Sequence, residues 1–254
     1  MNSRYFSGLA AIALLCCVPG DLLRPKSALA QESSASAESL TRLLEEHYRR
    51  PRTLRGVFLE RYSEGQRQVR VESGTVYFQR PGQMRWEYDS PEPKLFLVDG
   101  KTTWFYVPYD HTVTKVPVRE SSDWRTPFML LMGKTDLARL CSRVELISQR
   151  GIPSGHAVLR CLPREAKEPR PAANSRSPQP EFTPGKAPTD VLLEIDASTG
   201  ELARIEIREQ GGIDLEYRFG NWQTDVSLPK ELFHFQVPAG VAIVDGESLA
   251  GESN

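Results

Sequence analysis

The chain has 254 residues, of which 39% are hydrophobic and 26% are charged, and this length is enough for one large domain or two small ones. Its 32 basic and 33 acidic residues give a net charge of -1. Such a balance argues against a nucleic-acid-binding protein and against a protein held on a membrane surface by charge.

The N-terminal segment, 1–30, has the layout of a secretory signal peptide. Arg4 supplies a positive start, an apolar run follows over 8–18, and Ala28-Leu-Ala30 offers small residues for cleavage. Because the apolar run is too short to cross a bilayer, we expect secretion with cleavage. The mature protein, 31–254, is then expected to form one domain.

A lipid anchor at Cys16 or Cys17 is the alternative fate of this segment. A lipidation site needs small residues directly before the cysteine, whereas Leu14 and Leu15 precede Cys16. We therefore favour a soluble secreted protein. A lipidated N-terminus would indicate a membrane-anchored protein instead.

The mature chain begins with an amphipathic helix and continues into strands. Four residues recur at helical spacing over about three turns, and Pro51 ends the pattern. They are Leu40, Leu43, Leu44 and His47. A hairpin with strands over 54–62 and 68–80 follows, so the helix must pack its one apolar side against a neighbouring surface.

Successive strands separated by short turns are predicted from 74 to 118. The turns fall at Pro81-Gly82, Ser90-Pro91 and Asp99-Gly100, and the last of these is a strong hairpin signal. This segment is therefore expected to form an antiparallel meander.

Large apolar side chains recur at every second position of these strands. Met84, Trp86 and Tyr88 share one face of their strand, and Trp104 and Tyr106 share one face of a later strand. The sheet is thus expected to have a broad aromatic inner face, which another part of the chain must cover.

The periodicity changes after the meander. Thr126-Pro127 suits the start of a short helix that is apolar nearly all round, and Gly133 ends it. Thr135-Asp136 can cap a second short helix that runs to Leu140. Two short helices in a chain rich in strands are candidates to lie across the open face of the sheet.

Cys141 and Cys161 lie at the outer ends of a predicted hairpin whose loop is 151–155. In an oxidising compartment such a pair forms a disulfide, and closing a loop of about twenty residues stabilises the fold by roughly 3 kcal/mol. Two buried free thiols are the alternative, because the register of the hairpin can slip.

The C-terminal part combines a proline-rich segment with a last meander. Seven prolines alternate with charged and polar residues over 163–189, which predicts a disordered insertion, with a partner-binding arm as the alternative. Strands are predicted over 191–196, 202–208 and 213–219, and a final one over 233–237. The chain thus has eleven or twelve predicted strands and three helices.

No catalytic or metal-binding arrangement emerges from the residues. The four histidines lack ligand spacing, and there is no nucleophile elbow, phosphate-binding glycine loop or zinc-protease motif. Glu87 and Asp89 share a strand face as an acid and a base would, but solvated charge is the better interpretation. We therefore expect neither an enzyme nor a cofactor.

The apolar side chains of the meander and the short helices admit two interpretations. They form an ordinary core, or they line a hollow for apolar ligands that they leave unfilled, with methionines that adapt to varied shapes. In the second interpretation the lining consists of Met84, Trp86, Tyr88, Trp104, Tyr106, Phe128, Met129, Leu131 and Met132.

Three motifs carry a resemblance to a known family. They are Arg80-Pro-Gly-Gln-Met-Arg-Trp-Glu-Tyr88, Val98-Asp-Gly-Lys-Thr-Thr-Trp-Phe-Tyr106 and Thr126-Pro-Phe-Met-Leu-Leu-Met-Gly133. They resemble the outer-membrane lipoprotein carrier family, LolA, and the similarity extends from Leu40 to Val244. The proline-rich segment and the cysteine pair depart from the family pattern.

The resemblance implies a mainly β protein: a single antiparallel, incomplete (half) β-barrel of about eleven strands, closed by a lid of short α-helices. It implies a periplasmic chaperone that binds the acyl chains of lipoproteins in an apolar cavity and carries them to the outer membrane. The implied partners are acylated lipoproteins, an inner-membrane ABC exporter that releases them and an outer-membrane acceptor. We expect a monomer without a cofactor.

The resemblance also assigns residue roles. The family's arginine that holds the lid through hydrogen bonds to its backbone corresponds to Arg80, and cavity-lining positions correspond to Met84, Trp86 and Tyr88. Burying an acyl chain gains about 0.8 kcal/mol per methylene, so a carrier needs a device for release. A guanidinium with several fixed donors suits that task. A solvated arginine at a strand end is the alternative.

Three other functions compete with the carrier. A periplasmic sensor or regulator could use the same fold to detect lipid or lipoprotein. The membrane-anchored receptor of the same pathway would need a lipidated cysteine. A lipid hydrolase would need a nucleophile and a base, and no such pair emerges from the sequence.

Overall fold

The computed structural model describes residues 36–118, 126–133, 135–164 and 188–245. The predicted signal peptide, 1–30, lies outside the described residues, and so does most of the predicted proline-rich insertion. The two ends of that insertion are described, because Pro163 closes one strand and Pro188 opens the next.

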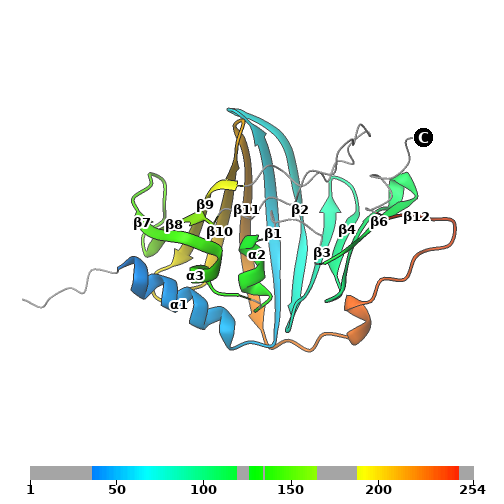
Figure 1. Cartoon of the computed structure of the whole chain (residues 1–254), viewed down its shortest axis with the longest axis horizontal. Helices are drawn as coiled ribbons and strands as arrows, with labels where there is room; N and C mark the ends of the chain where they lie inside the picture. The colour runs from blue at the N-terminus through cyan, green and yellow to red at the C-terminus, as the bar shows by residue number, and fades with distance from the viewer. Residues whose placement is uncertain (1–35, 119–125, 134, 165–187, 246–254) are drawn as a thin grey trace, which may run out of the picture. The chain divides into compact units, whose positions relative to one another are not determined.

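In the residues that the structure describes, twelve strands form one sheet (Figure 1). In chain order they are β1 (Thr53–Glu64), β2 (Arg67–Gln79), β3 (Gln83–Ser90), β4 (Lys94–Val98), β5 (Thr102–Val107), β6 (Thr112–Pro117), β7 (Cys141–Ile147), β8 (His156–Pro163), β9 (Pro188–Asp196), β10 (Leu202–Glu209), β11 (Ile213–Thr224) and β12 (Ala242–Asp245). Their order across the sheet is β12-β6-β5-β4-β3-β2-β1-β11-β10-β9-β8-β7.

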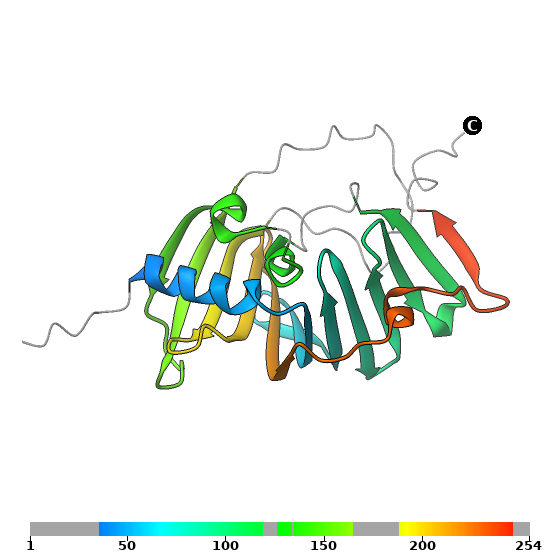
Figure 2. The same ribbon diagram turned by 90° about the horizontal axis from the view of Figure 1, so that it is seen from below.

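The pairing of β1 with β11 joins two meanders at the centre of the sheet. The edges are β12 and β7, so the strongly curved sheet stays open (Figure 2). These features confirm the mainly β, incomplete barrel, with twelve strands rather than about eleven. In the described ranges, β12 differs from the other strands because it runs parallel to its neighbour, β6.

The three α-helices of the described ranges lie on one side of this sheet, which we call the concave face (Figure 2). They are α1 (Ala37–Arg49), which the Ser36 side chain caps, and the short helices α2 (Thr126–Leu131) and α3 (Leu137–Leu140). Their apolar residues share one buried core with the inward-facing residues of the sheet. The prediction that the short helices lie across the open face is confirmed.

The two faces of the sheet differ in character. Ion pairs lie on the convex face, and aliphatic side chains lie on the concave face. Along β10, Ile205 and Ile207 are buried on the concave side, whereas Arg204 between them pairs with Glu194 (2.9 Å) and Glu206 (2.6 Å). The alternation of side chains thus separates the core from the ion pairs. Over the described ranges, no helix combines the length and apolar character that a membrane span requires.

The predicted disulfide is confirmed. Cys141 and Cys161 are bonded, with their Cα atoms 5.4 Å apart, and they join β7 to β8. The hairpin register pairs Val144 with Cys161, so the bond crosses between neighbouring strands as the sequence predicted.

The prediction of a final strand over 233–237 is wrong. The chain forms a 3-10 helix, η3 (Lys230–Phe233), and then runs without regular structure to β12. Phe233 is buried, and Arg85 Nη1 donates a hydrogen bond to the Leu232 carbonyl (3.0 Å). Because Arg85 lies on the convex side of β3, these residues pack over that side and do not extend the sheet.

Candidate functional site

Trp86 is the centre of an aromatic cluster on the concave face. Its indole lies edge-on to Phe58 (4.6 Å between ring centroids), Phe128 (4.9 Å) and Tyr217 (5.5 Å). Phe58 and Tyr217 belong to β1 and β11, and Phe128 belongs to α2. Segments far apart in the sequence therefore meet at this indole.

The space inside this cluster is almost filled. A cavity of about 10 Å³ remains, which is about the space of one water molecule. It is lined by Phe128 of α2 and by five residues of the sheet, which we call the aromatic bowl: Met84, Trp86, Tyr88, Phe96 and Tyr217. The hollow predicted from the sequence stays a prediction: in this structure Phe128 of α2 packs against Trp86 and Tyr217 and occupies the space over the bowl.

The strand register explains how the bowl is assembled. Trp86 lies opposite Phe96 across the β3–β4 pair, and Phe96 lies opposite Phe105 across β4–β5, so all three point to the concave side. Tyr217 reaches the bowl because β11 pairs with β1. Sequence reasoning did not select Phe96 or Tyr217. Alternation could place each on one face of its strand, but the neighbouring strands are set by tertiary pairing.

The structure brings together seven of the nine residues predicted to line the hollow. Met84, Trp86, Tyr88, Phe128, Leu131 and Met132 are buried in the common core, and Met129 packs against it. Trp104 and Tyr106 lie elsewhere. Their rings pack near Phe235, with centroids 5.4 and 5.6 Å away, and the β4–β5 register pairs them with Leu97 and Leu95 on the convex side. We leave these two residues out of the site.

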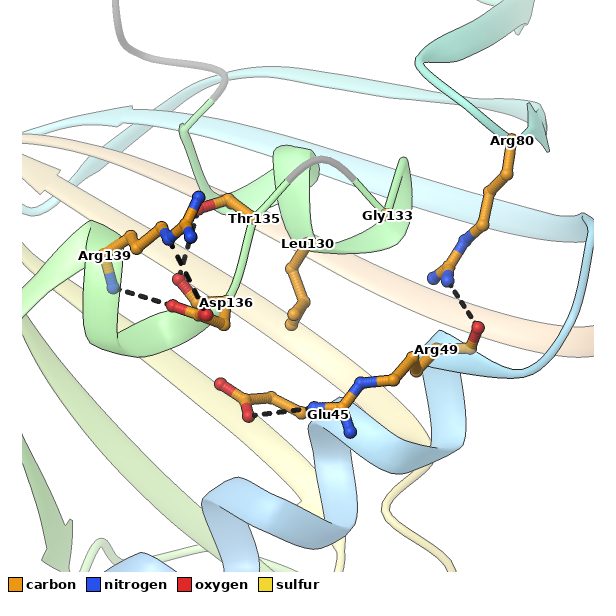
Figure 3. A pocket seen from close by; sticks show the side chains of 8 residues that line it. All are labelled: Glu45, Arg49, Arg80, Leu130, Gly133, Thr135, Asp136 and Arg139. Carbon is orange, nitrogen blue, oxygen red and sulfur yellow. Dashed lines mark hydrogen bonds and ion pairs between the residues drawn. The ribbon is translucent and has the colours of Figure 1, made fainter.

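Arg80 lies where β2 ends, between α1 and the end of α2 (Figure 3). Its Nη1 donates a hydrogen bond to the carbonyl of Arg49, the last residue of α1 (2.8 Å). Gly133 permits this position, because a Cβ there would lie 2.7 Å from Arg80 Nε. Partial burial, together with the nearby charge of Arg49, lowers the pKa of Arg80. The predicted latch residue thus contacts the backbone of α1 and lies against the end of α2.

A cleft of about 250 Å³ opens beside Arg80. It is lined by Glu45, Arg49, Arg80, Leu130, Gly133, Thr135, Asp136 and Arg139 (Figure 3). Within it, Glu45 Oε1 accepts a hydrogen bond from the backbone N–H of Leu137 (2.8 Å), which ties α1 to α3. Arg80 and Glu45 together therefore join the three helices at one side of the sheet.

The other chemical candidates are placed in ordinary surroundings. Glu87 is paired with Arg85 (2.6 Å), and Asp89 is exposed. His156 Nδ1 lies 2.9 Å from Glu194 on the convex face. Among the residues that the structure describes, no group of three or more His, Cys, Asp or Glu side chains could hold a metal ion.

The described fold is therefore an open, curved sheet with an aromatic bowl under short helices. A family model for the outer membrane lipoprotein carrier protein LolA matches residues 50–151. An outer-membrane lipoprotein carrier protein of Nitrosospira multiformis is 29% identical over 196 residues, which are 76% of this chain and 82% of that protein. One from Dechloromonas aromatica is 26% identical over 79% of this chain and 85% of its own length.

Over these ranges the chain is similar to outer-membrane lipoprotein carrier proteins of the LolA family. A solved LolA superfamily protein of Nitrosomonas europaea overlays with a TM-score of 0.41 and 10% identity, over 80% of this chain and 99% of that one, a score too low to add to the sequence matches.

Proposed function

We propose that this protein is a non-enzymatic periplasmic chaperone that binds the acyl chains of lipoproteins and carries them to the outer membrane. The observation that carries the proposal is the position of Phe128: a ring on a short helix fills an aromatic bowl that is otherwise suited to a hydrocarbon chain. The relatives named outer-membrane lipoprotein carriers support the same function.

The filled bowl supplies a means of release. An acyl chain gains about 0.8 kcal/mol for each methylene that it buries. Burying a Phe side chain gains about 1.5–3 kcal/mol, and a ligand must first displace Phe128 and so lose that burial. The net affinity is lower than burial of the chain alone would give, and return of α2 to the bowl favours handover.

Arg80 would hold α2 in place until a ligand displaces Phe128, and we call this role the latch. Its hydrogen bond to the Arg49 carbonyl fixes the guanidinium on α1, and its position against Gly133 would then hold the end of α2 in the closed position. A hydrogen bond from a charged donor contributes about 1.5–3 kcal/mol, which is comparable with the burial of one Phe ring. The hydrogen bond of the latch and the burial of the Phe128 ring therefore contribute similar free energies to the closed state.

The remaining parts of the proposal are supported by the similarity of the chain to outer-membrane lipoprotein carrier proteins. A signal peptide over 1–30 would deliver the chain to the periplasm. There it would act as a monomer without a cofactor. It would receive lipoproteins from an inner-membrane ABC exporter and pass them to an outer-membrane acceptor.

Purification of the protein from the periplasm of a bacterium with an outer membrane tests the carrier function. Mass spectrometry is expected to find co-purified proteins with acylated N-terminal cysteines. Recovery of the protein with no acylated partner would contradict the proposal. Recovery of a specific unacylated partner would favour the sensor instead.

A handover assay with a purified outer-membrane acceptor tests the latch. We expect Arg80→Leu to fold normally and to transfer at least about tenfold less lipoprotein, because the loss of one charged hydrogen bond corresponds to about that factor. Arg139→Leu is the matched control, since Arg139 lines the same cleft but its side chain is 78% exposed. Equal transfer by Arg80→Leu and the parent would rule out the latch.

A further inference from the structure

Two carboxylates interrupt the apolar concave face next to the aromatic bowl. Glu60 of β1 and Glu72 of β2 lie directly opposite each other, and each is only 4% exposed. Like charges opposite each other across a strand pair destabilise a sheet, and buried charges need partners. A purely structural core would be simpler with apolar residues at these two positions.

Two cations share this buried cluster. Arg70 Nη2 lies 3.9 Å from Glu60 Oε1, and Lys94 Nζ is in contact with Glu72. Arg70 Nε lies 3.1 Å from Glu72 Oε2, yet it is buried without a hydrogen-bond partner. The contact is thus one of charge, and the N–H of Nε keeps an unused capacity to donate.

Tyr88 connects this cluster to the aromatic bowl. Its ring lines the bowl, and its hydroxyl donates a hydrogen bond to Glu60 Oε2 (2.8 Å). Lys94 Nζ lies over the same ring, 5.6 Å from the centroid. A chain lying in the bowl and extending past Tyr88 would therefore reach the charged cluster.

We propose that Arg70 binds the carbonyl end of an acyl chain, an ester or a carboxylate, while the hydrocarbon tail lies in the aromatic bowl. The inference rests on the proposed function and adds to it a site for the polar end of the ligand. A carbonyl oxygen is an acceptor only, so it matches the unused donor of Arg70 and not the acceptors of Glu60 and Glu72.

The state of Glu60 supports an acceptor ligand at this place. Burial raises the pKa of Glu60 to about 7, against the lowering effect of its hydrogen bond from Tyr88. Near neutral pH a large fraction of Glu60 is therefore uncharged, which leaves Arg70 and Lys94 facing one carboxylate, Glu72. The surplus positive charge favours a carbonyl or carboxylate oxygen over a cationic head group.

Ligands with the same twelve-carbon chain and different polar ends test this assignment. Laurate, methyl laurate and dodecyltrimethylammonium are titrated against the full mature protein by displacement of a fluorescent apolar dye. We expect Arg70→Met to weaken the binding of laurate, or of both laurate and methyl laurate, about tenfold. Binding of the ammonium compound should be unchanged, because it offers no carbonyl oxygen. Loss for laurate alone identifies a carboxylate, and loss for both identifies a carbonyl.

The controls distinguish three effects: loss of the polar contact, loss of folding and failure of the proposed carrier function. Arg67→Met is the matched control, since Arg67 lies on the same strand and is exposed. If Arg70→Met does not fold, the double variant Arg70→Met with Glu72→Gln removes both members of the pair and leaves the net charge unchanged. Equal weakening of all three ligands, or of none, would overturn the role of Arg70. Failure of the parent to bind any of them would overturn the proposed function itself.

Discussion

The concave face is covered by α1 at one end and by α2 near its centre, and the two helices are attached differently. The thirteen-residue α1 is hydrogen-bonded to the loop between β9 and β10 and to the first residue of β10. The Tyr48 hydroxyl accepts a hydrogen bond from Leu202 N–H (2.9 Å), and His47 Nδ1 donates one to the Thr199 carbonyl (2.9 Å). The six-residue α2 covers the bowl by burial of Phe128, and Gly82 N–H donates to Met132 O (3.3 Å) just beyond it.

This difference indicates which helix a ligand can replace. An acyl chain can reproduce the apolar contacts of Phe128, but it has no donors or acceptors along its length to replace the hydrogen bonds of α1. We therefore expect the α1 region to be a permanent support and the α2 region to be exchangeable. The predictions below test that contrast.

Leu44→Ala should give the largest loss of stability. Leu44 is fully buried between α1 and the sheet, and Leu→Ala substitutions at such sites cost about 3–5 kcal/mol. Urea unfolding measures the loss, with exposed Arg42→Ala as the control. Because α1 is not the exchangeable helix, the affinity for laurate should stay within about twofold at a temperature where both variants are folded. A large rise in affinity would contradict the contrast.

The disulfide should stabilise the same region by a comparable amount. Cys141 and Cys161 are 20 residues apart in sequence, so reduction is expected to lower the free energy of unfolding by about 3 kcal/mol. Urea unfolding with and without a reductant measures the difference. The double variant Cys141→Ala/Cys161→Ala should unfold at the same urea concentration with and without the reductant. The prediction is contradicted if the reductant has no effect on the parent protein either.

Glu60, which lies next to the bowl, should make the free energy of unfolding depend on pH. Its pKa of about 7 in the folded protein is above its ordinary value of 4.5, mainly because of burial. Its contribution to stability is therefore complete at acidic pH below its unfolded pKa and is lost as pH rises through about 7. The neighbouring charges are those of Glu72, Arg70 and Lys94, with the Tyr88 hydroxyl as hydrogen-bond donor.

Glu60→Gln should remove this dependence, because the amide oxygen can still accept from Tyr88 and does not ionise. We expect the variant to be more stable than the parent at pH 8, by at most about 3 kcal/mol, and similar to it at pH 5. Glu87→Gln, on the convex side of β3, is the control. Parallel pH profiles for the parent and Glu60→Gln would show that Glu60 is not the titrating group.

The sequence was informative where one residue type decides a local structure. Asp99-Gly100 predicted a hairpin, and Asp99 Oδ1 accepts from Lys101 N–H and Thr102 N–H (both 2.8 Å) in that turn. Alternation also placed Met84, Trp86 and Tyr88 on one face. These features depend on neighbouring residues, which the sequence shows directly.

The sequence was uninformative where distant segments compete for the same surface. Trp104 and Trp86 have the same local pattern, but the register and the packing of Phe235 place Trp104 on the convex side. The filling of the bowl by Phe128 could not be predicted either, since it depends on how closely α2 approaches the sheet. Periodicity assigns side chains to faces, and it contains no information on what covers each face.

Phe128→Ala distinguishes an exchangeable lid from an ordinary core. If α2 competes with the ligand, removal of the ring opens the bowl, and the affinity for laurate should rise about tenfold because binding no longer has to displace it. Dye displacement measures the affinity, and Leu44→Ala serves as the matched core variant without such a gain. Should Phe128→Ala lose stability as Leu44→Ala does while its affinity for laurate is unchanged, Phe128 is a core residue and the bowl is not where the chain binds.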